Sequence, residues 1–154
     1  FEITQKQVIL SSLGRDSQFA FYTADTGAEC ALYWDVRSDL HPDTFATSTA
    51  SVTGETYARE VSCDKESPDV IIDSDTSNTV VSRFQFNLES VYKPEGLCAQ
   101  VSVKKCVGTF DTDGTCTSDL LKLQTIIHAD GYNTDCDSIE TNPRALQRSV
   151  EIKY

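Results

Sequence analysis

The chain has 154 residues, of which 39% are hydrophobic and 24% are charged, and its formal net charge is −11 at pH 7. This length predicts a single domain, residues 1–154, that is large enough to bury a hydrophobic core without help from metals. The strong acidity argues against nucleic acid and anionic membrane surfaces as partners, because both would repel the protein. No apolar run approaches the roughly 20 residues needed to cross a bilayer, so membrane insertion is not expected.

Apolar and polar residues alternate with period two along much of the chain, which is the pattern of half-buried β-strands. The clearest strand is predicted at 83–89 (RFQFNLE), where two phenylalanines and Leu88 share one face. In chain order, the predicted strands are 3–10, 18–23, 32–36, 57–62, 69–72, 83–89, 97–104, 120–128 and 150–154. This set predicts an all-β, disulfide-stapled fold, namely a two-layer antiparallel β-sandwich with the jelly roll as one variant.

The segment 44–56 is rich in threonine, serine and alanine. Because threonine favours strands, we expect an exposed edge hairpin there. A flexible or O-glycosylated loop is the alternative interpretation.

The cysteine count is even, and no CxxC pair suited to a metal site occurs. An even count with wide spacing predicts three disulfides and therefore an oxidising compartment, so we expect a secreted, extracellular protein. The predicted disulfide residues are Cys30, Cys63, Cys98, Cys106, Cys116 and Cys136. The chain opens with Phe1 and has no signal-like segment, as expected of a mature secreted product or of an excised piece.

The stretch 106–116 (CVGTFDTDGTC) is predicted to be a hairpin closed by a Cys106–Cys116 disulfide, because its Asp-Gly pair suits a tight turn. Cys98 cannot bond Cys106 if both lie on one strand, since eight residues would separate them by about 25 Å. The four remaining cysteines allow three pairings. Among these we favour Cys30–Cys63 together with Cys98–Cys136.

Three acidic loops are candidate calcium sites. An EF-hand that starts at Asp111 fails, because its glycine falls at position 4 and its twelfth residue is Lys122. Turn formation is the simpler role for these aspartates and asparagines, so no metal or cofactor is predicted, and calcium stays the alternative. The three sets are Asp111, Asp113 and Asp119; Asp73, Asp75 and Asn78; and Asp130, Asn133, Asp135 and Asp137.

Catalytic motifs are not evident in the sequence. The two histidines, His41 and His128, lie in no metal-protease or nucleophile motif, and an even cysteine count leaves no spare thiol. We therefore predict that the protein is not an enzyme. An acid-catalysed hydrolase with two facing carboxylates is kept as an alternative hypothesis.

If Trp34 points into the core, the adjacent Tyr33 points outward on a strand, where it could stack on a sugar or a partner.

These observations lead to two main hypotheses about function. The first is a non-catalytic, structural or adhesive extracellular module whose partners are other extracellular proteins or copies of itself. In an assembly or filament, the strand predicted at 3–10 would pair with a neighbour's sheet edge by β-augmentation. The second is a secreted carbohydrate-binding, lectin-like module, with calcium dependence as one option.

Overall fold

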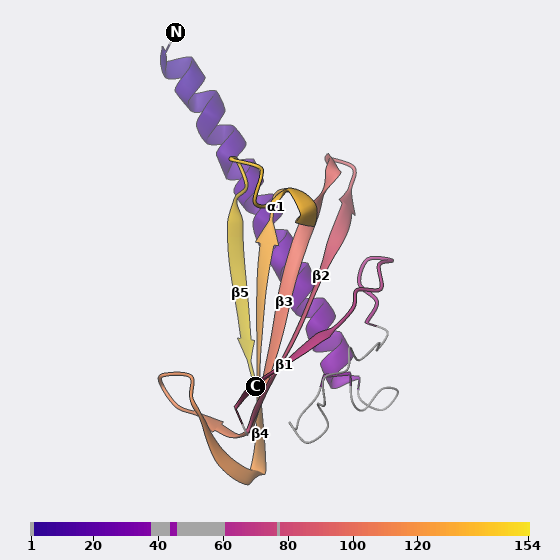
Figure 1. The fold of residues 1–154 in the computed structure, drawn as a ribbon. Helices are drawn as coiled ribbons and strands as arrows, with labels where there is room; N and C mark the ends of the chain where they lie inside the picture. Colours follow the sequence, from indigo (N-terminus) through magenta and orange to yellow (C-terminus); the bar gives the residue numbers. More distant parts are fainter. Residues whose placement is uncertain (1, 38–43, 46–60, 77) are drawn as a thin grey trace.

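The structure is a computed structural model, and it describes residues 2–37, 44–45, 61–76 and 78–154. One long N-terminal helix is followed by five antiparallel strands, and the helix lies diagonally across one face of their sheet (Figure 1). The elements are α1 (Glu2–Val36), β1 (Ile71–Thr76), β2 (Thr79–Ser90), β3 (Lys93–Phe110), β4 (Cys116–Tyr132), the short 3₁₀ helix η2 (Cys136–Ser138) and β5 (Gln147–Lys153).

The sheet is a meander in which the strands follow one another in the order β1-β2-β3-β4-β5. Its register aligns one apolar row across four strands, because Phe84 pairs with Val101, Val101 with Ala129, and Ala129 with Val150. Side chains alternate along each strand, so this row and its neighbours two residues away face α1. The core therefore lies between the helix and one face of the sheet.

The prediction of a β-rich, disulfide-bonded fold is confirmed, but the two-layer sandwich or jelly roll is not. In the part of the chain that the structure describes, the layer that covers the sheet is α1. The prediction of strands at 3–10, 18–23 and 32–36 is wrong, because all three segments belong to this helix. Short apolar runs do not distinguish strand from helix, and tertiary packing decided the outcome.

The strands predicted further along the chain agree with the structure. The segments 83–89, 97–104 and 120–128 lie within β2, β3 and β4, and 150–154 coincides with the end of β5 except for Tyr154. The prediction at 69–72 overlaps the start of β1. Only 61–62 of the strand predicted at 57–62 and only 44–45 of 44–56 fall within the described residues, and neither pair is a strand.

Helix α1 packs closely on the sheet because small residues line its inner face. The buried residues recur with the helical period, and they are Ala20, Thr23, Ala24, Gly27, Ala28 and Ala31. Gly131 of β4 lies against the helix backbone, so that a Cβ at this position would overlap the carbonyl oxygen of Ala20 and the amide nitrogen of Ala24. Because the residues on both surfaces are small, the helix can approach the sheet closely.

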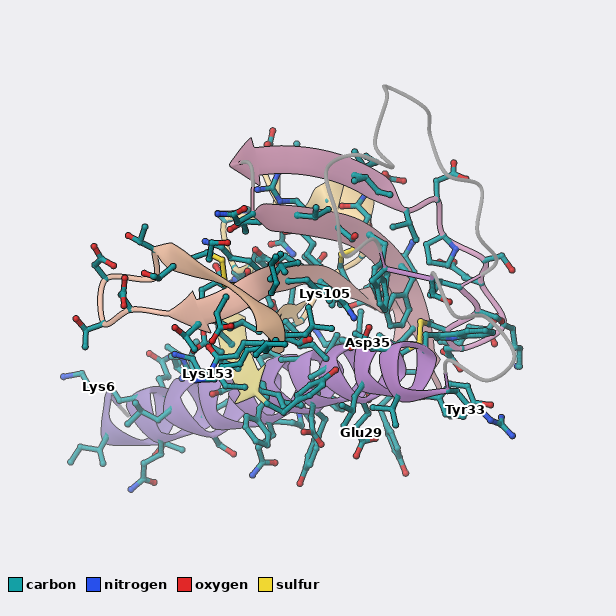
Figure 2. The ribbon with its side chains drawn as sticks, turned by 90° about the horizontal axis from the view of Figure 1, so that it is seen from below. Lys6, Glu29, Tyr33, Asp35, Lys105 and Lys153 are labelled. Carbon is teal, nitrogen blue, oxygen red and sulfur yellow. A yellow bond between two sulfur atoms is a disulfide. The ribbon has the colours of Figure 1, made fainter. Side chains whose placement is uncertain are left out.

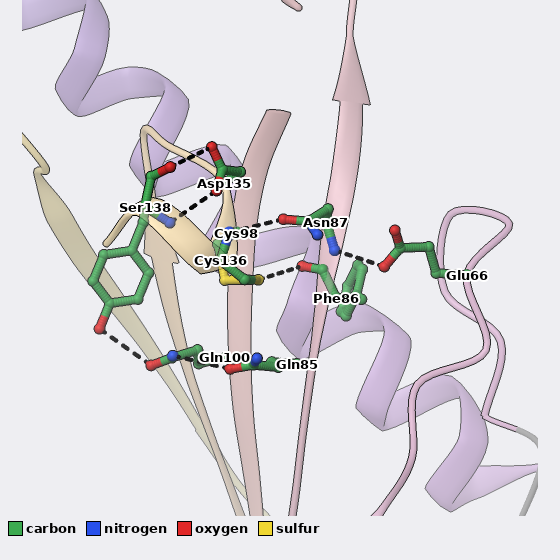
Figure 3. Close-up of a disulfide and its surroundings, with 10 residues drawn as sticks. Glu66, Gln85, Phe86, Asn87, Cys98, Gln100, Asp135, Cys136 and Ser138 are labelled. Carbon is green, nitrogen blue, oxygen red and sulfur yellow. Dashed lines mark hydrogen bonds between the residues drawn. A yellow bond between two sulfur atoms is a disulfide. The ribbon is translucent and has the colours of Figure 1, made fainter. Parts of the chain in front are cut away.

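Three disulfides join the elements, and they are the pairs favoured from the sequence. Cys30–Cys63 ties α1 to the segment before β1, and Cys106–Cys116 closes the β3–β4 hairpin. Cys98–Cys136 links β3 to η2 (Figure 3). Beside this bond, the Asp135 carboxylate accepts hydrogen bonds from the backbone N–H and the hydroxyl of Ser138 and so caps η2.

Candidate functional site: an exposed helix tip

The first turns of α1 project beyond the sheet (Figure 1). We call residues 3–15 the helix tip, and every one of them is exposed. At 1.5 Å per residue, this segment is about 20 Å long. Its exposed aliphatic side chains are Ile3 (73% exposed), Val8 (65%), Ile9 (59%), Leu10 (67%) and Leu13 (46%).

Most of these aliphatic side chains extend the same helix face that packs on the sheet. Residues seven apart lie almost in line on an α-helix, because two turns take 7.2 residues. Ile3 precedes Leu10 by seven residues, and Leu13 precedes the buried Ala20 by seven. The inner face of α1 thus continues past the sheet as an aliphatic stripe that the described residues leave uncovered.

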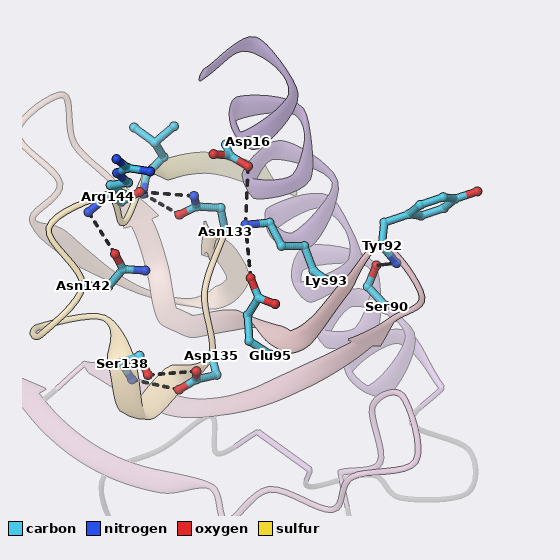
Figure 4. Close-up of polar contacts among 11 residues, drawn as sticks. Asp16, Ser90, Tyr92, Lys93, Glu95, Asn133, Asp135, Ser138, Asn142 and Arg144 are labelled. Atoms are coloured by element: carbon cyan, nitrogen blue, oxygen red, sulfur yellow. Dashed lines mark hydrogen bonds and ion pairs between the residues drawn. The ribbon is translucent and has the colours of Figure 1, made fainter. Parts of the chain in front are cut away.

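The base of the tip is held by polar contacts. Lys93 Nζ lies 3.4 Å from Asp16 Oδ1 and 3.4 Å from Glu95 Oε1, so the β2–β3 turn is tied to the helix (Figure 4). Arg148 Nε donates to the hydroxyl of Ser17 at 2.9 Å. The direction of the tip is therefore fixed at residues 16 and 17, where the helix reaches the sheet.

The other end of the helix is held by a buried ion pair. Lys105 Nζ lies 2.5 Å from Asp35 Oδ1, between helix and sheet, with both side chains more than 90% buried (Figure 2). The Tyr154 hydroxyl donates to Asp35 Oδ2 at 2.5 Å. Burial raises the pKa of Tyr154 well above its usual value, and the hydrogen bond to the Asp35 carboxylate and the negative charge of Asp35 act in the same direction.

The tip differs in charge from the rest of the chain. It contains Lys6 and Arg15 and no carboxylate, which gives a formal charge of +2. The whole chain carries −11, so the remaining residues carry −13. An aliphatic helix segment with a formal charge of +2 thus projects from an acidic body.

The acidic loop that suggested calcium is occupied by turn contacts. The Asp113 carboxylate accepts the backbone N–H of Thr115 at 3.0 Å, and this bond is the main cause of its lowered pKa. The Asp111 carboxylate accepts the Thr117 hydroxyl at 2.7 Å. The third member, Asp119, accepts the backbone N–H of Leu121 at 3.1 Å. These aspartates stabilise the hairpin, which is the role that the sequence favoured.

The predicted cluster of Asp130, Asn133, Asp135 and Asp137 is spread over two local networks. Asp130 Oδ1 accepts hydrogen bonds from Gln147 and Ser149 of β5. Asn133 bonds the backbone of Arg144 and Leu146, and Asp135 caps η2, whose first turn contains Asp137. The side chains of Asp73 and Asp75 lie outside the described part of the structure. Among the described residues, no group of three or more His, Cys, Asp or Glu side chains is arranged to hold a metal ion.

In the described ranges, no helix or strand covers the face of the sheet opposite α1, and this face is polar. A groove of about 740 Å³ crosses it, and its lining includes Gln85, Gln100, Ser102, His128 and Asp130. The imidazole of His128 lies 3.2 Å from Asp130 and 3.6 Å from Glu151. The second histidine, His41, lies outside the described residues.

Tyr33 lies on the outer face of α1, 48% exposed, with the Arg37 guanidinium 4.8 Å from its ring centre. Trp34 packs at the edge of the core, and its indole N–H donates to the Ser62 carbonyl at 3.0 Å. The expectation that Tyr33 points outward if Trp34 points inward agrees with these positions, although it assumed a strand and both residues sit on a helix. Val36, two residues after Trp34, is 65% exposed.

The helix tip is the surface that sequence reasoning missed, because its residues were assigned to a strand. The signal that could have revealed it is the seven-residue spacing between Ile3 and Leu10 and between Leu13 and Ala20.

No family model, curated protein or solved structure matches this chain. No helix in the described part of the chain has the length and apolarity to span a bilayer.

Proposed function

We propose that this protein is a non-catalytic subunit of an extracellular assembly, and that its copies associate through the helix tip. The observation that carries the proposal is the aliphatic stripe of residues 3–15, which continues the buried face of α1 into solvent. Fully burying an aliphatic side chain is worth about 1.5–3 kcal/mol, so covering several of them offers a large driving force for association.

The length of the tip supports the same conclusion. A free helix of about 13 residues is marginally stable in water, and Gly14 weakens this one further. The docked half of α1 provides a nucleus for the tip, and a protein surface laid over its aliphatic stripe would stabilise it. The charge of the tip makes the acidic body of a second copy a better cover than another cationic surface.

The mode of association differs from the one predicted from the sequence. The segment 3–10 is helical, so it does not present the extended row of N–H and C=O groups that pairing with a neighbour's sheet edge requires. Side-chain packing of the helix tip replaces β-augmentation by this segment in the proposal. The extracellular location is also part of the proposal, and it is supported by three disulfides and by the absence of free cysteines among the described residues.

The test is the mass of the full chain in solution as a function of concentration. We expect sedimentation velocity to show species above the 17.0 kDa monomer, and electron microscopy to show whether they form filaments. The double variant Leu10→Gln, Leu13→Gln should weaken association at least tenfold while it keeps the helical circular dichroism signal.

The matched control is Val36→Gln, which removes an aliphatic side chain of similar exposure from the other end of the same helix (65%, against 67% for Leu10). It should associate like the unmodified protein. The proposal fails if the unmodified chain stays monomeric at millimolar concentration. It also fails if the tip variant associates normally, or if the tip instead binds vesicles of neutral phosphatidylcholine.

A second candidate, a carbohydrate-binding module, is favoured by the polar groove on the open sheet face. Gln100 accepts from the Tyr132 hydroxyl at 3.3 Å and donates to Gln85 at 3.2 Å, so amide groups are held in position along the groove. Such groups suit sugar hydroxyls. A glycan array with and without a calcium chelator tests this candidate, and the absence of any signal would eliminate it.

A further inference from the structure

A second apolar surface lies on the β3–β4 hairpin. We call residues 108–123 the hairpin arm, which projects at the end of the molecule opposite the helix tip (Figure 1). Leu120 is 87% exposed, Leu121 95% and Leu123 50%. Two adjacent leucines that are almost fully exposed are unusual, because neighbouring residues of a regular strand point to opposite faces.

The register of the hairpin explains this exposure. Val107 pairs with Leu123 and Gly108 with Ser118, so residues 119–122 have no partner on β3 and form a bulge. The Asp119 carboxylate accepts the backbone N–H of Leu121 and shapes the bulge. Bulges commonly redirect side chains in this way. The bulge therefore presents both leucines to solvent as a small apolar knob.

The arm is a rigid platform for this knob. The Cys106–Cys116 disulfide ties the turn end of the arm to Cys106 of β3, and Gln124 accepts the backbone N–H of Phe110 at 2.7 Å. Lys104 Nζ reaches the carbonyl of Gly114 at 3.3 Å and ties the arm back to the sheet. Little ordering of the arm would be needed on binding, which favours association.

The arm and the helix tip are complementary in charge as well as in apolar character. The arm carries Asp111, Asp113 and Asp119 against Lys122, which is a formal charge of −2. The tip carries +2 with no carboxylate. Opposite charges around apolar side chains would favour this pairing over tip on tip or arm on arm, each of which joins like charges.

We infer that the hairpin arm of one copy docks on the helix tip of the next copy, with Leu120 and Leu121 packed against the stripe formed by Leu10 and Leu13. This inference rests on the proposed function and specifies its contact. The two surfaces differ and lie at opposite ends of the molecule, so the contact is head-to-tail. Repetition of a head-to-tail contact gives an open polymer unless the rotation between copies closes a ring.

The test combines two variants that each remove one of the two surfaces. The arm variant is Leu120→Gln, Leu121→Gln, and the tip variant is Leu10→Gln, Leu13→Gln. Either one alone should lose at least tenfold in association. A 1:1 mixture should form a discrete heterodimer of twice the monomer mass and nothing larger, because only one intact tip and one intact arm remain to pair.

Crosslinking identifies the contact directly. A photoreactive benzoylphenylalanine in place of Leu121 should crosslink to residues 3–15 of another copy, as read by mass spectrometry of the dimer band. The same group in place of the exposed Val91, on the β2–β3 turn, is the matched control and should give no such product.

The outcomes separate this inference from the proposed function. If the arm variant associates normally while the tip variant does not, the head-to-tail contact is wrong and the tip packs on another surface. The head-to-tail contact is also wrong if the mixture forms no heterodimer. It is equally wrong if residue 121 crosslinks to a site other than the helix tip. If neither variant changes association, the proposed function fails as well.

Discussion

The ammonium group of Lys105 on β3 lies 2.5 Å from the carboxylate of Asp35 on α1, and both side chains are buried. Two charges removed from water are tolerated only as a pair, because the attraction between them offsets the cost of their desolvation. The pair joins the last turn of the helix to the middle of the sheet. It therefore fixes the end of α1 that lies farthest from the exposed tip.

Replacement of Asp35 by asparagine should lower the free energy of unfolding by about 3–5 kcal/mol, because it leaves the Lys105 ammonium buried without its counter-charge. Urea denaturation followed by circular dichroism measures the change. The double variant Asp35→Leu, Lys105→Met should recover most of the loss, since it removes both charges. A small effect of the single variant would show that water reaches the pair.

Tyr154 should make the stability of the protein depend on pH at alkaline values. Its pKa is raised in the folded state, whereas an unfolded tyrosine titrates near pH 10. Below pH 10 the phenol is protonated in both states, so the contribution of its hydrogen bond to Asp35 is constant. At higher pH only the unfolded state loses the proton, and the free energy of unfolding falls.

The variant Tyr154→Phe tests this dependence. It should be less stable than the unmodified protein by about 1.5 kcal/mol at neutral pH, because it lacks the hydrogen bond to a carboxylate. The difference between the two proteins should shrink between pH 10 and pH 12 in urea titrations. The pKa of Tyr132 is also raised, but this residue is present in both proteins and cancels in the difference. A difference that stays constant with pH would contradict the assignment.

Gly131→Ala should separate the helix from the sheet. The added methyl group would overlap the backbone of α1 at Ala20 and Ala24, and neither atom belongs to a flexible side chain. We expect a loss of about 3 kcal/mol in thermal or urea denaturation. The control is Gly14→Ala in the helix tip, where a Cβ meets nothing within 4 Å and alanine favours the helix. That variant should not lose stability.

Removal of the Cys106–Cys116 disulfide by a double serine substitution should cost on the order of 2–3 kcal/mol, because the bond closes a loop with a sequence separation of 10. The equivalent change at Cys30 and Cys63, with a separation of 33, should cost about 4 kcal/mol. Denaturant midpoints of the two variants measure which disulfide contributes more to stability.

Asp113→Ala should leave calorimetric titration with calcium unchanged, because this carboxylate is engaged in the turn. A binding heat that the variant loses would instead identify the arm as a metal site.

The sequence alone determined most strands of the C-terminal half and indicated three disulfides. Strands such as β2 and β3 alternate large apolar residues with polar ones, and this pattern is a direct consequence of a sheet with one buried face. The Asp-Gly turn between Cys106 and Cys116 predicted their pairing, and the other four cysteines still allowed three combinations. The Asp113-Gly114 turn marked the hairpin because glycine adopts the positive φ found there.

Only the tertiary structure decided that residues 2–36 form a helix and that its tip stays exposed. The inner face of α1 is made of alanine, glycine and Thr23, so the helical period does not appear among large apolar residues. The large apolar residues of this segment instead alternate with polar ones over short runs, as in strands. The short distance between α1 and Gly131 explains this choice of small residues, but it exists only once helix and sheet meet. The uncovered stripe is likewise defined by where the sheet ends, and this boundary depends on contacts between residues more than a hundred positions apart, such as Ser17 and Arg148.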